Sequence, residues 1–498
     1  MARLHTYNEA IKALNLLQTN AAVLEKIKQD RVKKHVSQNL NETKNYLKTL
    51  GIDSNKLNQI NVIHVSGTKG KGSTCAFTES ILRQHGLKTG FYSSPHLVSA
   101  TERIRINGKP LSQKAFAEYF WNVYNQIVDR HDQKPSYFKF LTVMAFHVFI
   151  EEKVDVAVIE VGIGGSFDCT NVVEKPVAVG ITLLDYDHVQ VLGDTIEKIA
   201  WQKAGIMKSG SIAFANPSQP EGALKVLKER SEEIGSTLHF VPPLDNYDWR
   251  KFPPHQIGLF PQVHAYNASL ALQLARYFVT RKLPNQDGFA LNWKEALGLR
   301  LCFWPGRSQV VRKDHQTYFL DGAHTDQSMI ACRHWFDHVH DASAHKVLVF
   351  NSTGDRNPEV LLKPLVDFKF SLAIFCTNET KHEHLQNDNT NLNFSFPYAL
   401  RKCEANQATW NKLQTKLCNN DMDHSLVPSR AVSHIEDALH IINKLPEAHQ
   451  KPVHVYVTGS LHLVGGVLSF IHPNCYEKMS DEMQAEVTLR EEYTKLDD

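Results

Sequence analysis

The sequence predicts an α/β fold in which two mostly parallel sheets form one after the other along the chain. Strand-like apolar runs alternate with helical patterns over most of the 498 residues, which is typical of parallel sheets. Most of these runs end in glycine or polar residues, as expected where the carboxyl ends of parallel strands form a ligand site. A Pro-Gly break at 305–306 separates the two series. We therefore predict one domain over 1–303 and a smaller one over 304–498.

The first series contains three expected strands. They span 60–66, 154–161 and 177–184, and their apolar runs have the length of buried strands. A glycine-rich turn and a helix over 73–85 follow the first strand, and a further helix is expected over 196–206. The turn after the first strand therefore lies at the carboxyl edge of the predicted sheet.

The second series repeats this pattern after the break. Each expected strand is again followed by small or polar residues, and a surface loop rich in Asn, His and Thr interrupts the series at 377–395. The expected strands are 317–320, 346–351, 371–376 and 453–457.

Composition excludes several classes of protein. Hydrophobic residues make up 42% and charged residues 22%, which is ordinary for a globular chain. The formal net charge is only +2, which argues against a nucleic-acid-binding coat or a membrane-surface protein. No apolar run is long enough for a transmembrane helix. An anionic substrate must therefore be bound by a local arrangement of groups.

The eight cysteines and the start of the chain predict a cytoplasmic protein. The cysteines are scattered without a CxxC pair, which favours reduced thiols in a reducing compartment. Residues 1–17 are expected to form an amphipathic helix. They lack the apolar core of a signal peptide and have few basic residues for a mitochondrial presequence.

The glycine-rich turn, GTKGKGS at 67–73, is the strongest single signal in the chain. Glycines allow backbone N–H groups to converge on phosphate oxygens, and the following helix adds its positive end. Lys71 is expected to bridge the β- and γ-phosphates of a nucleotide. The match to the usual P-loop pattern is imperfect because Gly72 separates Lys71 from Ser73. The alternative is a glycine-rich turn with two solvated lysines, and Lys69 in particular fits that alternative.

Each polar residue at the ends of the next strands is compatible with either a functional or a structural role. Glu160 lies at the end of an apolar strand, where a carboxylate is costly unless it is paired or binds a metal such as Mg²⁺. His188 and its neighbours Asp185 and Asp187 are equally compatible with turn and capping roles. The residues alone favour a plain structural role for Lys203.

Two residues of the second domain are candidates for nucleotide contact. Arg307 follows the Pro-Gly break, where an arginine can reach a phosphate when domains close. Asp321 follows a strand and can accept hydrogen bonds from a ribose. Structural roles are equally compatible with both positions.

A series of motifs occurs along nearly the whole chain. In order, they are GTKGKGS at 67–73, SSPHL at 93–97, ERIRING at 102–108, EVGIGG at 160–165, DHVQVLGDT at 187–195, KAGIMK at 203–208, WPGR at 304–307, DGAHT at 321–325, TGDR at 353–356 and TGSLHLVGG at 458–466. Together these motifs resemble the folylpolyglutamate synthase family, which shares a superfamily with the Mur ligases. The segment LLQTNA at 16–21 is similar to the eukaryotic branch of this family.

The resemblance implies a fold and a set of site residues. The fold is a P-loop ATP-binding domain followed by a smaller Rossmann-like domain. Lys203 matches a lysine that is carbamylated in related ligases. The chain departs from the family at Lys69, where bacterial members have asparagine, and around 184–187. The implied ATP-binding residues are Gly70, Lys71, Gly72, Ser73, Arg307 and Asp321, the implied Mg²⁺ ligands are Ser94, Glu160 and His188, and the implied catalytic residues are Lys71, Lys203 and His188.

The implied reaction joins L-glutamate to the γ-carboxylate of a reduced folate through an acyl phosphate. ATP and Mg²⁺ are the implied cofactors, with K⁺ as a monovalent activator. The implied protein is a monomer that acts on small molecules, and the family also occurs in mitochondria. The alternatives are a dihydrofolate synthase, alone or bifunctional, and a P-loop NTPase without ligase activity.

Overall fold

The structure, a computed structural model, forms two compact units. Unit 1 contains Met1–His96, Thr101–Phe303 and Lys478–Asp498, and unit 2 contains Leu97–Ala100 and Trp304–Glu477. The division after Phe303 coincides with the expected boundary, but unit 2 differs from the expected 304–498 domain in two segments. The described residues are 6–18, 36–128, 130–131, 133–252, 257–283, 289–354, 356–381, 388, 395–420, 425–445, 451–476, 489–490 and 492–494.

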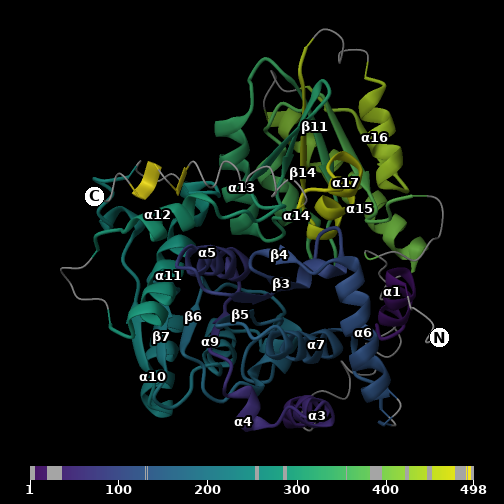
Figure 1. Cartoon of the computed structure of the whole chain (residues 1–498). Helices are drawn as coiled ribbons and strands as arrows, with labels where there is room; N and C mark the ends of the chain where they lie inside the picture. Colours follow the sequence, from purple (N-terminus) through teal and green to yellow (C-terminus); the bar gives the residue numbers. More distant parts are fainter. Residues whose placement is uncertain are drawn as a thin grey trace. The chain divides into compact units, whose positions relative to one another are not determined.

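Unit 1 contains an eight-stranded sheet in the order β4-β3-β2-β5-β1-β6-β7-β8 (Figure 1). The six strands from β2 to β8 in this order are parallel, and β3 and β4 continue the sheet in antiparallel pairs. The strands are β1 Val62–Ser66, β2 Thr89–Tyr92, β3 Ile104–Ile106, β4 Lys109–Pro110, β5 Val156–Glu160, β6 Ala178–Ile181, β7 Ile212–Ala215 and β8 Thr237–Phe240.

The expected strands at 60–66, 154–161 and 177–184 are confirmed as β1, β5 and β6, each slightly shorter than predicted. All three are buried along their length, which explains why their sequences are mainly apolar. The two expected helices are confirmed as α5 and α9. The helices of unit 1 are α1 Tyr7–Asn15, α3 Val36–Thr49, α4 Ser54–Leu57, α5 Lys71–Gln84, α6 Gln113–Val128, α7 Tyr137–Glu151, α8 Val189–Leu192, α9 Ile196–Ala204, α10 Glu221–Ile234, α11 Pro261–Thr280 and α12 Trp293–Arg300, with 3₁₀ turns η1 Ala100–Arg103, η2 Cys169–Val172 and η3 Leu244–Asn246.

Helices cover both faces of this sheet. On β6, Val179 packs in a core cluster with residues of α9 and α10, whereas a Cβ at the next residue, Gly180, would lie 3.0 Å from Leu274 of α11. Neighbouring residues of a strand point to opposite faces, so α9 and α10 lie opposite α11. In Figure 1, α11 lies beside α5, the helix that follows the glycine-rich turn.

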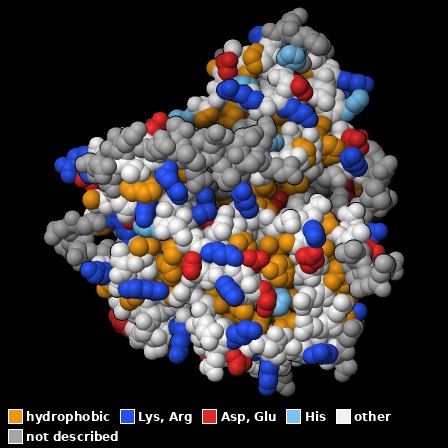
Figure 2. All heavy atoms as spheres, viewed as in Figure 1, with side chains coloured by type: hydrophobic (Ala, Val, Ile, Leu, Met, Phe, Trp, Pro, Cys, Tyr) orange, Lys and Arg blue, Asp and Glu red, His pale blue; other side chains and the backbone are white. Residues whose placement is uncertain are grey.

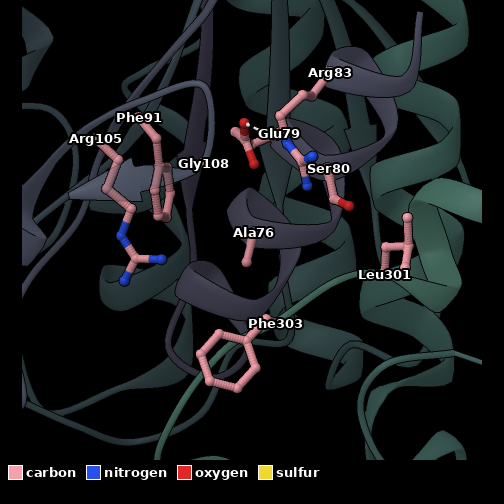
Figure 3. A pocket seen from close by; sticks show the side chains of 9 residues that line it. All are labelled: Ala76, Glu79, Ser80, Arg83, Phe91, Arg105, Gly108, Leu301 and Phe303. Atoms are coloured by element: carbon pink, nitrogen blue, oxygen red, sulfur yellow. Dashed lines mark ion pairs between the residues drawn. The ribbon is translucent and has the colours of Figure 1, made fainter. Parts of the chain in front are cut away.

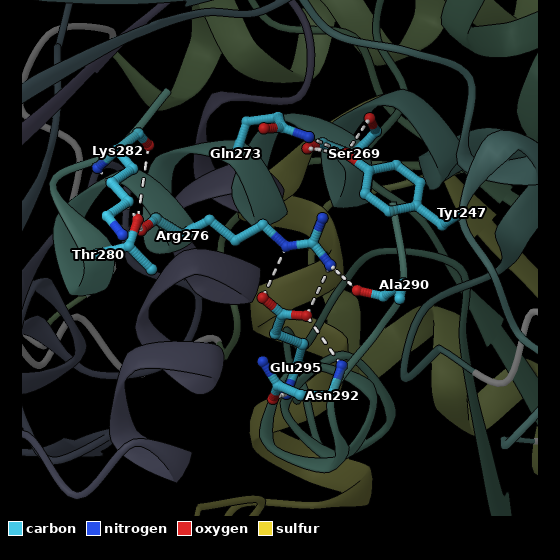
Figure 4. Close-up of polar contacts among 9 residues, drawn as sticks. All are labelled: Tyr247, Ser269, Gln273, Arg276, Thr280, Lys282, Ala290, Asn292 and Glu295. Carbon is cyan, nitrogen blue, oxygen red and sulfur yellow. Dashed lines mark hydrogen bonds and ion pairs between the residues drawn. The ribbon is translucent and has the colours of Figure 1, made fainter. Parts of the chain in front are cut away.

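A buried ion pair joins α11 to α12 (Figure 4). The Arg276 guanidinium donates from Nε and Nη2 to the two carboxylate oxygens of Glu295 at 2.6 and 2.7 Å. Nη2 also donates to the Ala290 carbonyl at 2.7 Å, and the guanidinium lies 5.2 Å from the Tyr247 ring centroid. Glu295 in turn accepts the N–H of Asn292 in the capping box of α12. Both helices pack on α5, so the pair supports the helix behind the loop.

Unit 2 contains a six-stranded sheet in the order β13-β12-β11-β14-β10-β9, parallel except for β9. The four expected strands of the second series are confirmed as β10, β11, β12 and β14. The expected loop at 377–395 lies mostly outside the described residues. The elements are β9 Gln309–Lys313, β10 Gln316–Leu320, α13 Asp326–Val339, β11 His345–Phe350, α14 Pro358–Leu362, η4 Lys363–Leu365, β12 Leu372–Cys376, α15 Phe396–Asn420, β13 Ser429–Val432, α16 Ile435–Asn443, β14 Val453–Thr458 and α17 Leu461–Ile471.

Three further expectations concern the described residues. The eight cysteines are all free thiols, and seven of them are buried. Among the described helices, none combines the length and the apolar character needed to cross a membrane. The expected N-terminal helix over 1–17 is confirmed as α1, whose capping box joins Thr6 to Glu9, while residues 1–5 lie outside the described chain.

Candidate active site

The glycine-rich loop between β1 and α5 is shaped by contacts that leave no room for side chains at two positions. Gly67 has a φ of +150°, and a Cβ there would lie 1.7 Å from Oγ1 of Thr182. Gly70 has a φ of +84°, and a Cβ there would lie 2.2 Å from Oδ1 of Asn267 on α11. The loop conformation therefore requires glycine at both positions.

Backbone hydrogen bonds tie the first part of the loop to the chain after β6. The N–H groups of Thr68 and Lys69 both donate to the Leu183 carbonyl at 3.0 Å. Oγ1 of Thr68 also exchanges hydrogen bonds of 3.0 and 3.1 Å with the backbone of Asp185. This pairing holds the loop along the carboxyl edge of the sheet.

The second part of the loop is the amino end of α5. The helix begins at Lys71, two residues earlier than predicted, and its N-cap Gly70 makes no side-chain capping bond. By helix geometry the N–H groups of the first turn, including Gly72 and Ser73, point out of the helix end. These amides and the helix dipole favour an anion such as a phosphate group.

Lys71 and Glu160 lie close to the same buried residue. Burial raises the pKa of the Cys75 thiol well above its usual value; Glu160 raises it further and Lys71 lowers it. Glu160 is the last residue of β5 and pairs in register with Val65 on β1, directly before the loop. The sheet therefore brings a cation and a carboxylate together at the loop.

Ser94 is held against Glu160. Its backbone N–H donates to Oε2 of Glu160 at 3.1 Å, and it follows β2, which pairs with β5. Glu160 is only 5% exposed. The two oxygen-bearing side chains thus belong to neighbouring strand ends of one sheet.

His188 lies in a more open environment. It has a φ of +51° at the start of α8, its side chain is 43% exposed, and its Nε2 lies 3.9 Å from Oδ2 of Asp187. Its backbone N–H donates to Oδ1 of the same aspartate at 3.0 Å. These contacts show how the turn around His188 is held, and its role as a ligand stays a prediction.

The donor set fits a Mg²⁺ ion that is held partly by phosphates. No group of three or more His, Cys, Asp or Glu side chains arranged for a metal occurs within the described chain. Magnesium keeps several waters and takes one or two carboxylates plus substrate phosphate oxygens, so a dedicated protein cage is not required. Glu160 and the Ser94 hydroxyl offer hard oxygen atoms of this kind, and their role as ligands stays a prediction.

Lys203 lies directly behind the glycine-rich loop. It is in the last turn of α9, 3% exposed, and its Nζ donates to the Gly67 carbonyl at 2.7 Å. Burial and then Lys71 lower the pKa of this amine well below its usual value, while Asp187 opposes the shift. Lys203 therefore contacts the loop directly and favours its neutral form, and its catalytic role stays a prediction.

The sequence analysis missed a buried polar chain beside EVGIGG. Asp168, 7% exposed, accepts the N–H of Ile163 at 3.0 Å and the Oγ1–H of Thr170 at 2.6 Å. His64 of β1 is hydrogen-bonded through Nε2 to Thr170 Oγ1 at 2.9 Å. These bonds fix the turn that follows Glu160. The signal was an aspartate after a glycine-rich turn, which resembles an ordinary loop residue in sequence.

We expect His64 to make the protein lose stability in acid. Burial, and next Lys208, lower the pKa of His64 to about 3, so it stays neutral in the folded state. An unfolded histidine titrates near 6.5, so between about pH 6.5 and 3 the unfolded state binds more protons. Within this window, His64 should lower the free energy of unfolding by about 1.4 kcal/mol for each unit by which the pH decreases. Urea unfolding of wild type and His64→Gln at several pH values measures it. A stability difference between them that does not change with pH contradicts the assignment.

In unit 2, Arg307 and Asp321 lie together around a tight turn. Asp321 is buried and accepts the N–H groups of Ser308 at 2.7 Å and Ala323 at 2.9 Å. A Cβ at Gly322 would lie 2.9 Å from Nη1 of Arg307. Burial raises the pKa of Asp321 and the Arg307 charge lowers it. Asp321 therefore already orders this loop, and its ribose contact stays a prediction.

A separate small cavity lies on the flank of α5 and contains none of the predicted site residues (Figure 3). Glu79 there accepts a hydrogen bond from Thr89 at 2.6 Å, and Nε of Arg83 lies 3.6 Å from the same carboxylate oxygen. On its other side the Arg105 guanidinium lies 5.2 Å from the Phe91 ring centroid. Glu79 therefore has a hydrogen-bond donor in Thr89 and a nearby cation in Arg83, in keeping with a structural role for this carboxylate.

Comparison with known proteins decides the family. The family model of the Mur ligase middle domain matches residues 65–274. The chain is 41% identical to the mitochondrial folylpolyglutamate synthase of Homo sapiens, over 94% of this chain and 92% of that protein. The chain belongs to the folylpolyglutamate synthase family. It is also 38% identical to the folylpolyglutamate synthase of Saccharomyces cerevisiae (strain YJM789), over 93% of this chain and 86% of that protein.

Solved structures share the fold. The Mycobacterium tuberculosis folylpolyglutamate synthase complexed with ADP matches with a TM-score of 0.70 at 23% identity, over 93% of this chain and 99% of that chain. The bifunctional folylpolyglutamate synthase/dihydrofolate synthase of Yersinia pestis, complexed with AMPPNP and a Mn ion, matches with a TM-score of 0.64 at 25% identity, over 92% and 99% of the two chains. The predicted α/β class is confirmed. As a family member the chain is an ATP-dependent ligase that joins glutamate to folates, with Mg²⁺ as the usual metal.

Proposed function

We propose that this chain binds the phosphates of ATP at Gly70, Lys71, Gly72 and Ser73. The observation that carries the proposal is the amino end of α5 presented beside Glu160 at the carboxyl edge of the sheet. Basic and acidic side chains are interspersed on the face shown in Figure 2, so a polyanion gains little from the overall charge. A local cradle of amides and one lysine supplies the attraction instead.

The reaction begins when the γ-carboxylate of a reduced folate or folylpolyglutamate attacks the γ-phosphorus of ATP. The bond to the β-phosphate oxygen breaks, ADP leaves, and an acyl phosphate remains. The amine of L-glutamate then attacks the acyl carbon, phosphate leaves and the amine proton is lost. Lys71 and the first turn of α5 neutralise the phosphates so that a second anion can approach.

We assign Ser94, Glu160 and His188 as the Mg²⁺ ligands. The support is the Ser94–Glu160 contact and the oxygen donors it provides. When bound, the metal supplies further positive charge at the transferring phosphate. K⁺ as a monovalent activator belongs to the same proposal and is tested by replacing K⁺ with Na⁺ in the assay. In unit 2 we assign Arg307 and Asp321 to nucleotide contact, supported by their shared position at one turn.

Lys203 is proposed to carry a carbamate. A neutral amine is the form that reacts with CO₂, and the lowered pKa of Lys203 favours it. The new negative charge would lie near Lys71, whose positive charge disfavours the protonated amine.

We expect Lys203→Ala to lower kcat by roughly 10² to 10³, with partial recovery when a short carboxylic acid is added, because the acid replaces the missing carboxylate. The recovery is measured as initial rate against added acetate. A carbamate resonance in ¹³C NMR after exposure to labelled bicarbonate tests the group directly. A fully active Lys203→Ala variant contradicts the assignment.

The function is tested with tetrahydrofolate, Mg-ATP and labelled glutamate, following ADP release and label transfer together. Equal amounts of ADP and labelled product are expected, whereas ADP release that does not require glutamate indicates an NTPase. The bifunctional relative makes dihydrofolate synthase activity the second candidate. Supplying dihydropteroate in parallel with tetrahydrofolate separates the two by product mass.

We further propose that the protein works as a monomer in the cytoplasm, with a mitochondrial form. The mammalian relatives are named mitochondrial, which supports the second compartment. Sedimentation of the purified protein tests the oligomeric state. Fractionation of cells that express the endogenous gene tests the compartments.

A further inference from the structure

The chain that leaves β6 remains extended beyond the strand, at 182–184. On the β1 side it continues the ladder: the Thr182 N–H donates to the Ser66 carbonyl at 2.9 Å, and the Leu183 carbonyl accepts the two loop amides described above. On the other side its neighbour β7 has ended at Ala215. Thr182 and Leu184 are buried, so their outward-facing backbone groups need other partners.

One side chain supplies both partners. Gln219 lies between β7 and α10, is 7% exposed, and its Nε2 donates to the Thr182 carbonyl at 2.8 Å. Its Oε1 accepts the Leu184 N–H, also at 2.8 Å. A primary amide has the same donor and acceptor as a peptide group. Gln219 therefore takes the place of the strand that β7 no longer provides.

The segment held by Gln219 is connected to the proposed ATP site in two ways. Its Leu183 carbonyl receives the N–H groups of Thr68 and Lys69 and so holds the glycine-rich loop. Its carboxyl end leads directly into the turn with Asp187, whose charge acts on Lys203. A shift of this segment moves the loop and that turn together.

We infer that Gln219 is a positioning residue for the ATP site. Its Oε1 and Nε2 both bond to the backbone of 182–184, and it acts through that segment. The inference rests on the proposed binding of ATP phosphates by the glycine-rich loop.

The test replaces Gln219 by methionine, which has similar length and makes neither hydrogen bond. The Kd for Mg-ATP and the KM for ATP should rise about 10-fold, the scale typical of groups that orient a binding residue. The KM for tetrahydrofolate at saturating ATP should stay unchanged. Isothermal titration and initial rates, at a temperature where the variants are folded, measure these quantities.

Gln414 offers a matched control in unit 2. It is 1% exposed, its Nε2 donates to the Val366 carbonyl at 2.7 Å, and its Oε1 accepts the Val427 N–H at 3.4 Å. Gln414→Met should lower the melting temperature as Gln219→Met does, but leave the Kd for Mg-ATP within about twofold of wild type. Equal loss of stability in both variants with unchanged ATP binding in both overturns the inference.

Two further variants keep the result decisive. Gln219→Glu retains the acceptor for Leu184 and loses the donor for Thr182, so it carries the test if the methionine variant does not fold; unchanged ATP binding by it overturns the inference. Lys71→Ala tests the loop assignment separately. If it leaves the Kd for Mg-ATP unchanged, the proposed phosphate site fails and the inference on Gln219 fails with it.

Discussion

Replacing Lys71 by alanine should lower kcat for glutamate ligation by about 10³-fold. The approaching folate carboxylate and the triphosphate are both anions, and the lysine at the first position of α5 is the cation nearest the helix end in the loop. Its charge matters most when negative charge gathers on the transferring phosphate, so the loss should appear in kcat as well as in KM for ATP. Initial rates of ADP release at saturating folate and glutamate measure it.

The fold should be unaffected by this substitution. Alanine suits the first turn of a helix, and Lys71 is only half-buried, so the melting temperature should remain that of wild type. Lys225→Ala, on the exposed face of α10, serves as the control and should retain full activity. A stable Lys71→Ala variant that works at a near wild-type rate rules out the proposed role of the loop.

Breaking the Arg276–Glu295 pair should produce the largest loss of stability. The two side chains are 13% and 5% exposed, so removing one partner leaves the other charged group buried without its counter-charge. We expect Arg276→Met to lower the free energy of unfolding by about 3–5 kcal/mol. Urea unfolding followed by circular dichroism measures the change. The double variant Arg276→Met/Glu295→Leu should recover much of the loss, since the hydrophobic pair carries no buried charge.

Two comparisons separate the charge pair from other effects. Glu295→Gln keeps a side chain that can complete the capping box of α12 but removes the charge, so it should remain strongly destabilising. The exposed pair Lys225–Glu229 on α10 should tolerate Glu229→Gln without a measurable change in melting temperature. If Arg276→Met is no worse than this surface variant, the pair does not stabilise the packing behind α5.

The sequence predicted the central strands because most of their residues are apolar. Strands β1, β5 and β6 are buried on both faces, so each is built mainly from hydrophobic residues, with His64 in β1 and Glu160 in β5 among the exceptions, and that pattern is visible without a structure. The glycine-rich loop was visible for a related reason. The backbone conformation and close neighbours require glycine at positions 67 and 70, so the requirement is visible in the sequence as a glycine-rich motif.

Other parts of the site depend on residues that are distant in sequence. Asn267 fills the space beside Gly70, and Asp168 joins His64 through Thr170, although none of these pairings has a local sequence signal. Which segments form each unit was equally hidden. Leu97–Ala100 belongs to unit 2 although it precedes the Pro-Gly break, because packing rather than chain order assigns it.

The sequence by itself determined the α/β class, seven of the strands that the structure describes (β1, β5, β6, β10, β11, β12 and β14), the glycine-rich loop and, through its motifs, the family. Only the tertiary structure decided that Ser94 lies against Glu160, that the buried amine of Lys203 donates to the loop, and that Gln219 completes the edge of β6. The physical reason is that local patterns record what the backbone and burial require at each position. Contacts between strand ends depend instead on the register of a sheet whose strands are far apart in the chain.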